Sequence, residues 1–156
     1  ALKPYFPTKD DLLTFAFGHV FNRTNKRIAD VTAGQAGLAA LRAFCVEVLP
    51  LDEERINEAR IVIPFWQKAI NDPDKARIHR DSMEQWLAAM RQHLTEARRA
   101  GSVTTAVSDA ALAGQLLNFL LGAQIAAALA PEGQVELGLN EQLEGFLTLL
   151  GCEARQ

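Results

Sequence analysis

Hydrophobic residues recur every three or four positions along nearly the whole chain, and no stretch alternates between polar and apolar residues over the length of a strand. A period of three to four residues is that of an amphipathic α-helix. The sequence therefore predicts an all-α fold in which prolines and glycines separate six helices. The predicted helices span residues 9–31, 35–48, 52–70, 73–100, 110–130 and 140–150.

Short local signals mark the predicted helix ends. Thr8 can cap the first helix through its hydroxyl, and Asp72 followed by Pro73 is a typical start for the fourth. Gly101 is expected to end the fourth helix in a left-handed conformation. Asp109 is predicted to cap the fifth.

Pro64 falls inside the third predicted helix, where it removes one backbone hydrogen bond. We expect a kink beside it; the alternative is a separate short helix that begins at the proline. The inward positions predicted for this helix are Ile56, Ala59, Ile63, Trp66 and Ile70.

The fifth predicted helix is apolar nearly all round, so it must be covered on every side. Together with the amphipathic sixth helix it suggests a homodimer, in which both helices pack against their own copies across a two-fold axis. The alternative is a monomer that buries both helices internally. The predicted interface residues are Ala113, Leu116, Leu120, Ala123, Ala127, Leu143, Phe146, Leu147 and Leu150.

The composition fits one domain, because 49% of the 156 residues are hydrophobic and can form a core without disulfides or metal. Cys45 and Cys152 stand in no metal-binding or redox spacing, which indicates reduced thiols in a cytoplasmic protein. Residues 110–130 are long enough to cross a bilayer, but amide side chains interrupt them. We interpret the segment as a buried helix and expect no membrane contact.

No motif for catalysis or for a cofactor stands out. The chain lacks a nucleophile elbow, a paired-histidine zinc spacing and a glycine-rich phosphate loop, and His19, His79 and His93 lie far apart. We therefore predict no enzyme activity, no metal site and no cofactor.

Aromatic and methionine side chains on the inward faces of four predicted helices suggest a mostly apolar cavity, and two amides on the fifth could supply its polar groups. The alternative is that the same residues fill a solid core. The candidate ligand-binding residues are Phe17, Phe21, Phe44, Phe65, Trp66, Met83, Trp86, Met90, Gln115 and Asn118.

Charge is uneven along the chain. The first 34 residues hold five lysines and arginines against three aspartates, a net charge of +2, whereas the whole chain carries −3, which leaves −5 for the rest. The acidic body is not expected to bind nucleic acid. Lys9 opposes the dipole of the first helix, so a phosphate outside that N-terminus would explain it.

The N-terminal residues Leu2-Lys3-Pro4-Tyr5-Phe6-Pro7-Thr8-Lys9-Asp10-Asp11-Leu12-Leu13 resemble a known junction. In transcriptional regulators of the tetracycline-repressor (TetR) family, a recognition helix ends in Leu-Tyr-x-His/Tyr-Phe-x-Ser/Thr-Lys-x-x-Leu. By this resemblance Tyr5 and Lys9 contact operator phosphates. Lys3 stands where the family has a tyrosine, so it is expected at the DNA as either a phosphate or a base contact.

The resemblance extends over nearly the whole chain and implies its organisation. Residues 1–8 would end a recognition helix and join it to a helix-turn-helix domain absent before Ala1, so the chain is expected to be truncated at its N-terminus. Residues 9–156 would form a TetR-like bundle that dimerises through its last two helices.

The expected function is that of a regulator, in most cases a repressor, whose small-molecule inducer lowers its affinity for operator DNA. The resemblance adds Asn25 to the candidate ligand residues. Two other classes stay open: a helical-bundle enzyme or carrier, and a plain dimerisation module without a ligand.

Overall fold

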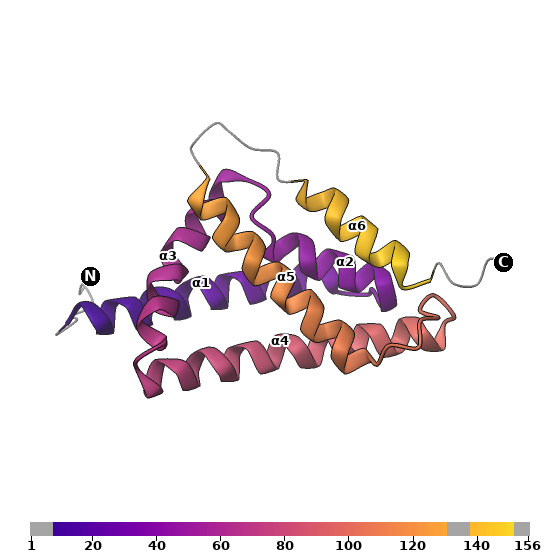
Figure 1. The fold of residues 1–156 in the computed structure, drawn as a ribbon, viewed down its shortest axis with the longest axis horizontal. Helices are drawn as coiled ribbons and strands as arrows, with labels where there is room; N and C mark the ends of the chain where they lie inside the picture. Colours follow the sequence, from indigo (N-terminus) through magenta and orange to yellow (C-terminus); the bar gives the residue numbers. More distant parts are fainter. Residues whose placement is uncertain (1–7, 131–137, 152–156) are drawn as a thin grey trace.

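The structure is a computed structural model that describes residues 8–130 and 138–151, and within these ranges it contains six α-helices and no strand. The predicted all-α fold is confirmed. The helices are α1 (Lys9–Thr32), α2 (Gly37–Val48), α3 (Glu53–Ala69), α4 (Pro73–Arg99), α5 (Asp109–Leu129) and α6 (Leu139–Leu149) (Figure 1).

Most helix ends form as the local signals predict. The Thr8 hydroxyl oxygen accepts a hydrogen bond from the backbone N–H of Asp11 at 3.1 Å and caps α1. Asp72 caps α4, with Pro73 as its first residue. Gly101 has a φ of 84°, the left-handed conformation that lets the chain leave α4.

Asp109 does not cap α5, so this prediction is wrong. Ser108 holds the capping position, and its hydroxyl oxygen accepts from the backbone N–H of Ala111 at 3.1 Å. The Asp109 carboxylate instead accepts from the Thr95 hydroxyl at 2.9 Å and from Nε of Arg98 at 3.1 Å. Asp109 therefore ties the start of α5 to the end of α4.

Helix α3 runs without interruption through Pro64, so the alternative of a separate short helix is wrong; the kink stays a prediction. Its buried apolar residues are Ala59, Val62 and Phe65, whereas Ile70 lies beyond its C-terminal end with 80% of its surface exposed. The inward face is therefore shifted by one position from the predicted face over the second half of the helix.

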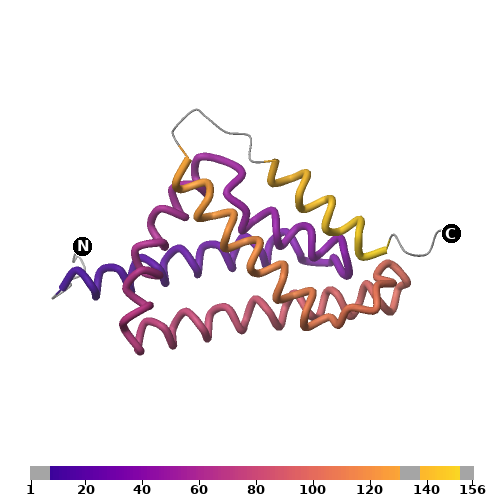
Figure 2. The backbone as a smooth tube through the Cα atoms, in the orientation of Figure 1, coloured from indigo at the N-terminus to yellow at the C-terminus, as the bar shows by residue number. Residues whose placement is uncertain are grey.

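The six helices pack as a bundle around α1, α4 and α5. Helix α1 packs against α2 and α3, while α4 packs against α2, α3 and α5. Helix α5 crosses the bundle obliquely, and α6 packs against α2 far from the start of α1 (Figures 1 and 2).

The buried core has two parts. A large cluster joins α2, α4, α5 and α6, and a small one, with Phe17 and Phe65 at its centre, joins α1 and α3. Among the described residues α5 is the one helix long and apolar enough to cross a membrane, with 44% of its apolar window buried. This is weak evidence for a membrane span, because a helix central to a bundle core meets the same criteria.

Candidate functional site

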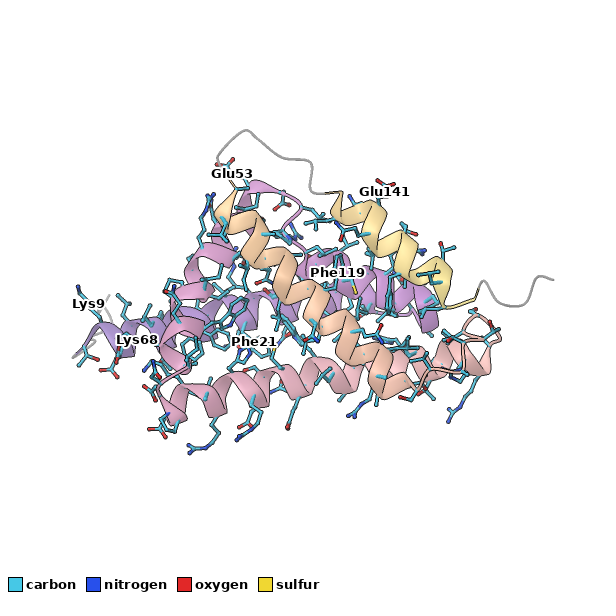
Figure 3. The ribbon with its side chains drawn as sticks, in the orientation of Figure 1. Lys9, Phe21, Glu53, Lys68, Phe119 and Glu141 are labelled. Atoms are coloured by element: carbon cyan, nitrogen blue, oxygen red, sulfur yellow. The ribbon has the colours of Figure 1, made fainter. Side chains whose placement is uncertain are left out.

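A cavity of about 40 Å³ lies between α1, α3 and α4, with further wall from α2 and α5. Its volume is enough for about three water molecules. Figure 3 shows Phe21, one of its lining residues, in the space between α1 and α4. The lining residues are Phe17, Val20, Phe21, Thr24, Glu47, Val48, Arg55, Glu58, Ala59, Val62, Trp66, Met83, Trp86 and Gln124.

One part of the cavity wall is aromatic. The Phe17 ring stacks on Phe65 with centroids 4.3 Å apart, and the Phe21 ring lies 5.2 Å from Trp86. Nε1 of Trp86 donates a hydrogen bond of 2.7 Å to Oδ1 of Asn25, which fixes the indole. The aromatic wall is thus built from α1, α3 and α4 and held in place by groups behind it.

Another part of the wall belongs to a partly buried ionic network. Arg27 of α1 donates from Nη2 and Nη1 to the two carboxylate oxygens of Glu58 on α3, at 2.9 and 3.1 Å, and from Nε to Glu47 on α2 at 3.2 Å. Arg55 on α3 also donates to Glu47, and Nη2 of Arg27 reaches the Thr24 hydroxyl oxygen at 3.4 Å. The network therefore joins three helices around the cavity.

Each cation of this network has carboxylate partners. The hydrogen bonds from Arg27 to Glu58, followed by Coulombic attraction, outweigh the effect of burial and raise the pKa of Arg27. Burial of Arg55 opposes its charge, but hydrogen bonding and attraction to Glu47 outweigh it, and its pKa is raised as well. Arg27 and Arg55 thus face Glu47 and Glu58 beside the cavity, and Arg55 also pairs with Asp52, whose side chain is 51% exposed.

The predicted ligand residues divide into four groups, the last of which is Gln115 and Asn118 on α5. Five line the cavity, and three stand behind the lining: Asn25 bonds to Trp86, Phe44 meets its ring edge-on at 5.8 Å, and Phe65 stacks on Phe17. Met90 is fully buried in the large core. The five that line the cavity are Phe17, Phe21, Trp66, Met83 and Trp86.

Gln115 and Asn118 do not line the cavity; both lie on the exposed side of α5, and their assignment as ligand residues is corrected. The buried amide is Gln124, whose Nε2 donates to the carbonyl oxygen of Val48 at 3.4 Å. Because α5 is apolar nearly all round, its periodicity could not indicate which amide faces inward.

The polar lining of the cavity was not predicted from the sequence. A signal existed for Thr24, which lies three and seven residues after Phe21 and Phe17 and therefore shares their face of α1. No local signal existed for Glu47, whose role depends on arginines from two other helices.

Eight of the nine predicted interface residues are buried within the chain itself, and only Phe146 is partly exposed. They pack in the chain's own core, and their part in a dimer interface stays a prediction. Exposed residues of α5 form a row in which spacings of four and three residues alternate. This spacing is also found where two helices pack along their length. This row, the α5 stripe, consists of Ala111, Gln115, Asn118, Gly122, Ile125 and Leu129.

Of the three predicted DNA-contacting residues, Lys3 and Tyr5 lie outside the described residues. Lys9 is exposed at the first position of α1, at the outer end of the helix in Figure 3. Its neighbour Asp10 lies 3.8 Å from Nζ of Lys68, which links the ends of α1 and α3.

Over residues 8–130 and 138–151, no group of three or more histidine, cysteine, aspartate or glutamate side chains could hold a metal ion. The three histidines named above also occupy separate places. His19 is exposed on α1, whereas His79 and His93 lie at different levels of α4.

Comparison with known proteins identifies the family. No curated protein sequence matches the chain. The crystal structure of a transcriptional regulator (RHA1_ro04179) from Rhodococcus sp. Rha1 is similar, with a TM-score of 0.77 and 25% identity over 93% of this chain and 74% of that one. Residues 37–148 match the family described as BetI-type transcriptional repressor, C-terminal. The chain therefore belongs to the TetR family of transcriptional regulators and contains the C-terminal region of such a protein.

Proposed function

We propose that this chain is the ligand-binding and dimerisation body of a cytoplasmic TetR-family repressor, in which a small-molecule inducer enters the cavity and weakens operator binding. One observation carries the proposal: α1 supplies cavity wall through Phe17, Phe21 and Thr24 and also carries the exposed Lys9 at its N-terminus. A change in the cavity is therefore connected by one helix to the end expected to face DNA.

The size of the cavity supports a mechanism by population shift. At about 40 Å³ it is smaller than the roughly 150 Å³ apolar cavity that accommodates benzene in a well-studied protein. A ligand of that size must therefore favour a conformation with a wider cavity, in which α1, α3 or α4 has moved. To weaken operator binding tenfold, it must stabilise that conformation by about 1.4 kcal/mol relative to the DNA-binding one.

The α5 stripe supports dimerisation. Small residues such as Ala111 and Gly122 allow close approach of two helices, and the stripe ends at Leu129, which is 79% exposed. Leu149 of α6 is exposed as well. A second copy that covers both helices would bury on the order of 1,200–2,000 Å².

A matched pair of glycine variants tests the dimer. A Cβ atom added at Gly122 or at Gly18 of α1 meets no atom within 4 Å, so we expect Gly122→Glu and Gly18→Glu both to fold. We expect Gly122→Glu to sediment as a monomer, because it places charge in the dimer seam, and Gly18→Glu to sediment as a dimer. A dimeric Gly122→Glu protein would refute the α5 interface.

Filling the cavity tests ligand binding. Ala59 is 1% exposed and lines the cavity, so Ala59→Val has space for its methyl groups. The matched control is Ala40→Val, at a buried position that does not line the cavity. Overpacking there should lower the free energy of unfolding by about 1–3 kcal/mol. We expect compounds that raise the melting temperature of the natural chain to have no effect on Ala59→Val but to act on Ala40→Val. If no compound acts on any of the proteins, the result counts against ligand binding and favours a dimerisation module without a ligand.

The DNA-facing end is tested in the full-length protein. Lys9→Ala should weaken operator binding and reduce the slope of log affinity against log salt by about one, because one phosphate contact is lost. Lys26→Ala, also exposed on α1 but far from its N-terminus, is the control and should change neither quantity. An unchanged affinity in Lys9→Ala would refute the phosphate contact.

A further inference from the structure

Two buried polar atoms, one of them on a residue that lines the cavity, have no hydrogen-bond partner in the described part of the chain: Nε1 of Trp66 and Nδ1 of His79. They come from neighbouring rings, which meet edge-on with centroids 5.9 Å apart. Trp66 lines the cavity, and His79 also lies 6.3 Å from Phe17, another lining ring. Because buried polar groups are nearly always hydrogen-bonded, this pair requires an explanation.

The two atoms have complementary chemistry. The indole Nε1–H can only donate a hydrogen bond. Burial lowers the pKa of His79, so its imidazole is neutral at pH 7, and the tautomer with its proton on Nε2 leaves Nδ1 as an acceptor. With the proton on Nε2, a partner for both atoms must accept one hydrogen bond and donate another; with the proton on Nδ1, it must accept from both.

We propose that the inducer is an uncharged molecule with a hydroxyl group on an apolar, aromatic-sized body, and that this hydroxyl accepts from Trp66 Nε1 and donates to His79 Nδ1. The inference rests on the proposed ligand-binding function. With the His79 proton on Nε2, a carbonyl would leave Nδ1 without a donor, and in either tautomer an ammonium could not accept from the indole.

The ionic network supports the absence of charge on the ligand. Arg27 and Glu58 pair through two hydrogen bonds, and Glu47 accepts from both Arg27 and Arg55. Since both arginines of the network already have carboxylate partners, an ionised ligand would bring an uncompensated charge into the partly buried site. The apolar body of the ligand would contact Phe17, Phe21 and Trp86 instead.

Phenol and benzene differ by the hydroxyl alone and serve as probes. With only two tryptophans in the chain, the indole N–H signals in an NMR spectrum are those of Trp66 and Trp86, and the Trp66→Phe variant assigns them. We expect phenol to bind about tenfold more tightly than benzene, as two added hydrogen bonds of modest net strength allow. Phenol should shift the Trp66 indole signal toward that of the hydrogen-bonded Trp86, and benzene should not.

Ring-preserving variants locate the hydroxyl. In Trp66→Phe and in His79→Phe the preference for phenol should fall to about threefold, and in the double variant to about one. His19→Phe, at an exposed histidine of α1, is the control and should keep the full preference.

Each outcome decides the inference. Equal binding of phenol and benzene, or a phenol preference without a shift of the Trp66 signal, would refute the hydroxyl assignment and leave the ligand cavity standing. Benzoate binding as tightly as phenol would refute the uncharged class. If neither phenol nor benzene binds at millimolar concentration, this inference fails, and the thermal-shift comparison with Ala59→Val decides the ligand-binding function separately.

Discussion

Replacing Arg27 with methionine is the most informative perturbation of this bundle. Arg27 donates three hydrogen bonds to two carboxylates and thereby holds α1 against α2 and α3. Methionine keeps an apolar stem of similar length but removes the charge and every donor. The variant leaves Glu58, whose side chain is 10% exposed, without the cation that occupied both of its oxygens.

The expected loss of unfolding free energy is about 3 kcal/mol. Removing one partner of a buried ion pair costs about 3–5 kcal/mol, because the other charge stays desolvated and unpaired. We take the low end, since the Arg27 side chain is 23% exposed and water can reach part of the network. Most of this loss comes from the isolated carboxylate of Glu58, not from the absent arginine.

A matched control lies one turn earlier on the same helix. Arg23 pairs with Glu54, again from α1 to α3, but both side chains are more than half exposed, at 52% and 55%. An exposed pair contributes about 0–1 kcal/mol, so Arg23→Met should be nearly neutral. The two arginines thus test burial at constant chemistry.

Urea unfolding at one fixed protein concentration measures these differences, since the stability of a dimer depends on concentration. Circular dichroism reports the loss of helix. Adding Glu58→Met to Arg27→Met removes the isolated charge and should restore at least about 2 kcal/mol. If Arg27→Met loses no more than Arg23→Met, or if the double variant is the least stable of the three, the account of the network is wrong.

Three further predictions concern single sites. Gly151→Ala should lower the free energy of unfolding, since its new Cβ would lie 2.8 Å from a backbone oxygen. Gly18→Ala should raise it by about 0.5–1 kcal/mol, and urea unfolding measures both changes. Burial raises the pKa of Cys45 to about 12, so thiol reagents should label it only on unfolding, and stability should fall as pH rises from 9 toward 12. Burial lowers the pKa of His79, so its contribution to stability should be lost as pH falls below about 6.5, and thermal melts of His79→Phe should lack this dependence.

The ends of the helices could be predicted from sequence because they depend on neighbouring residues. Thr8 caps α1 through a hydrogen bond to a residue three positions away, and Asp72 with Pro73 starts α4 in the same local way. Even the error at Asp109 was a choice between two adjacent capping residues. Local chemistry of this kind is readable without a fold.

The orientation of α5 could not be predicted, because an apolar residue stands on every side of the helix. The sequence pattern predicts Leu116 and Leu120 at a dimer interface, but both side chains are buried in the chain's own core. Gln115 and Asn118 face outward. Which side is buried depends on the shapes of α2, α3 and α4. Periodicity contains no information about those shapes.

The polar wall of the cavity was unpredictable for a different reason. Arg27 and Glu58 are 31 positions apart, and each resembles an ordinary surface charge when considered with its sequence neighbours. Only the packing of α1 on α3 brings them together. The aromatic wall was easier to predict from the sequence, because Phe17 and Phe21 share one face of one helix.

Because α1 is an uninterrupted helix, it can transmit a tilt at one end to the other end. Eighteen residues separate Lys9 from Arg27, a length of about 27 Å along the helix axis. If the ionic network acts as the fulcrum, a tilt of about 5° displaces the Lys9 end by about 2.4 Å, more than half the length of a hydrogen bond. A small movement of α1 at the cavity can therefore produce a larger displacement at its N-terminal end, at Lys9.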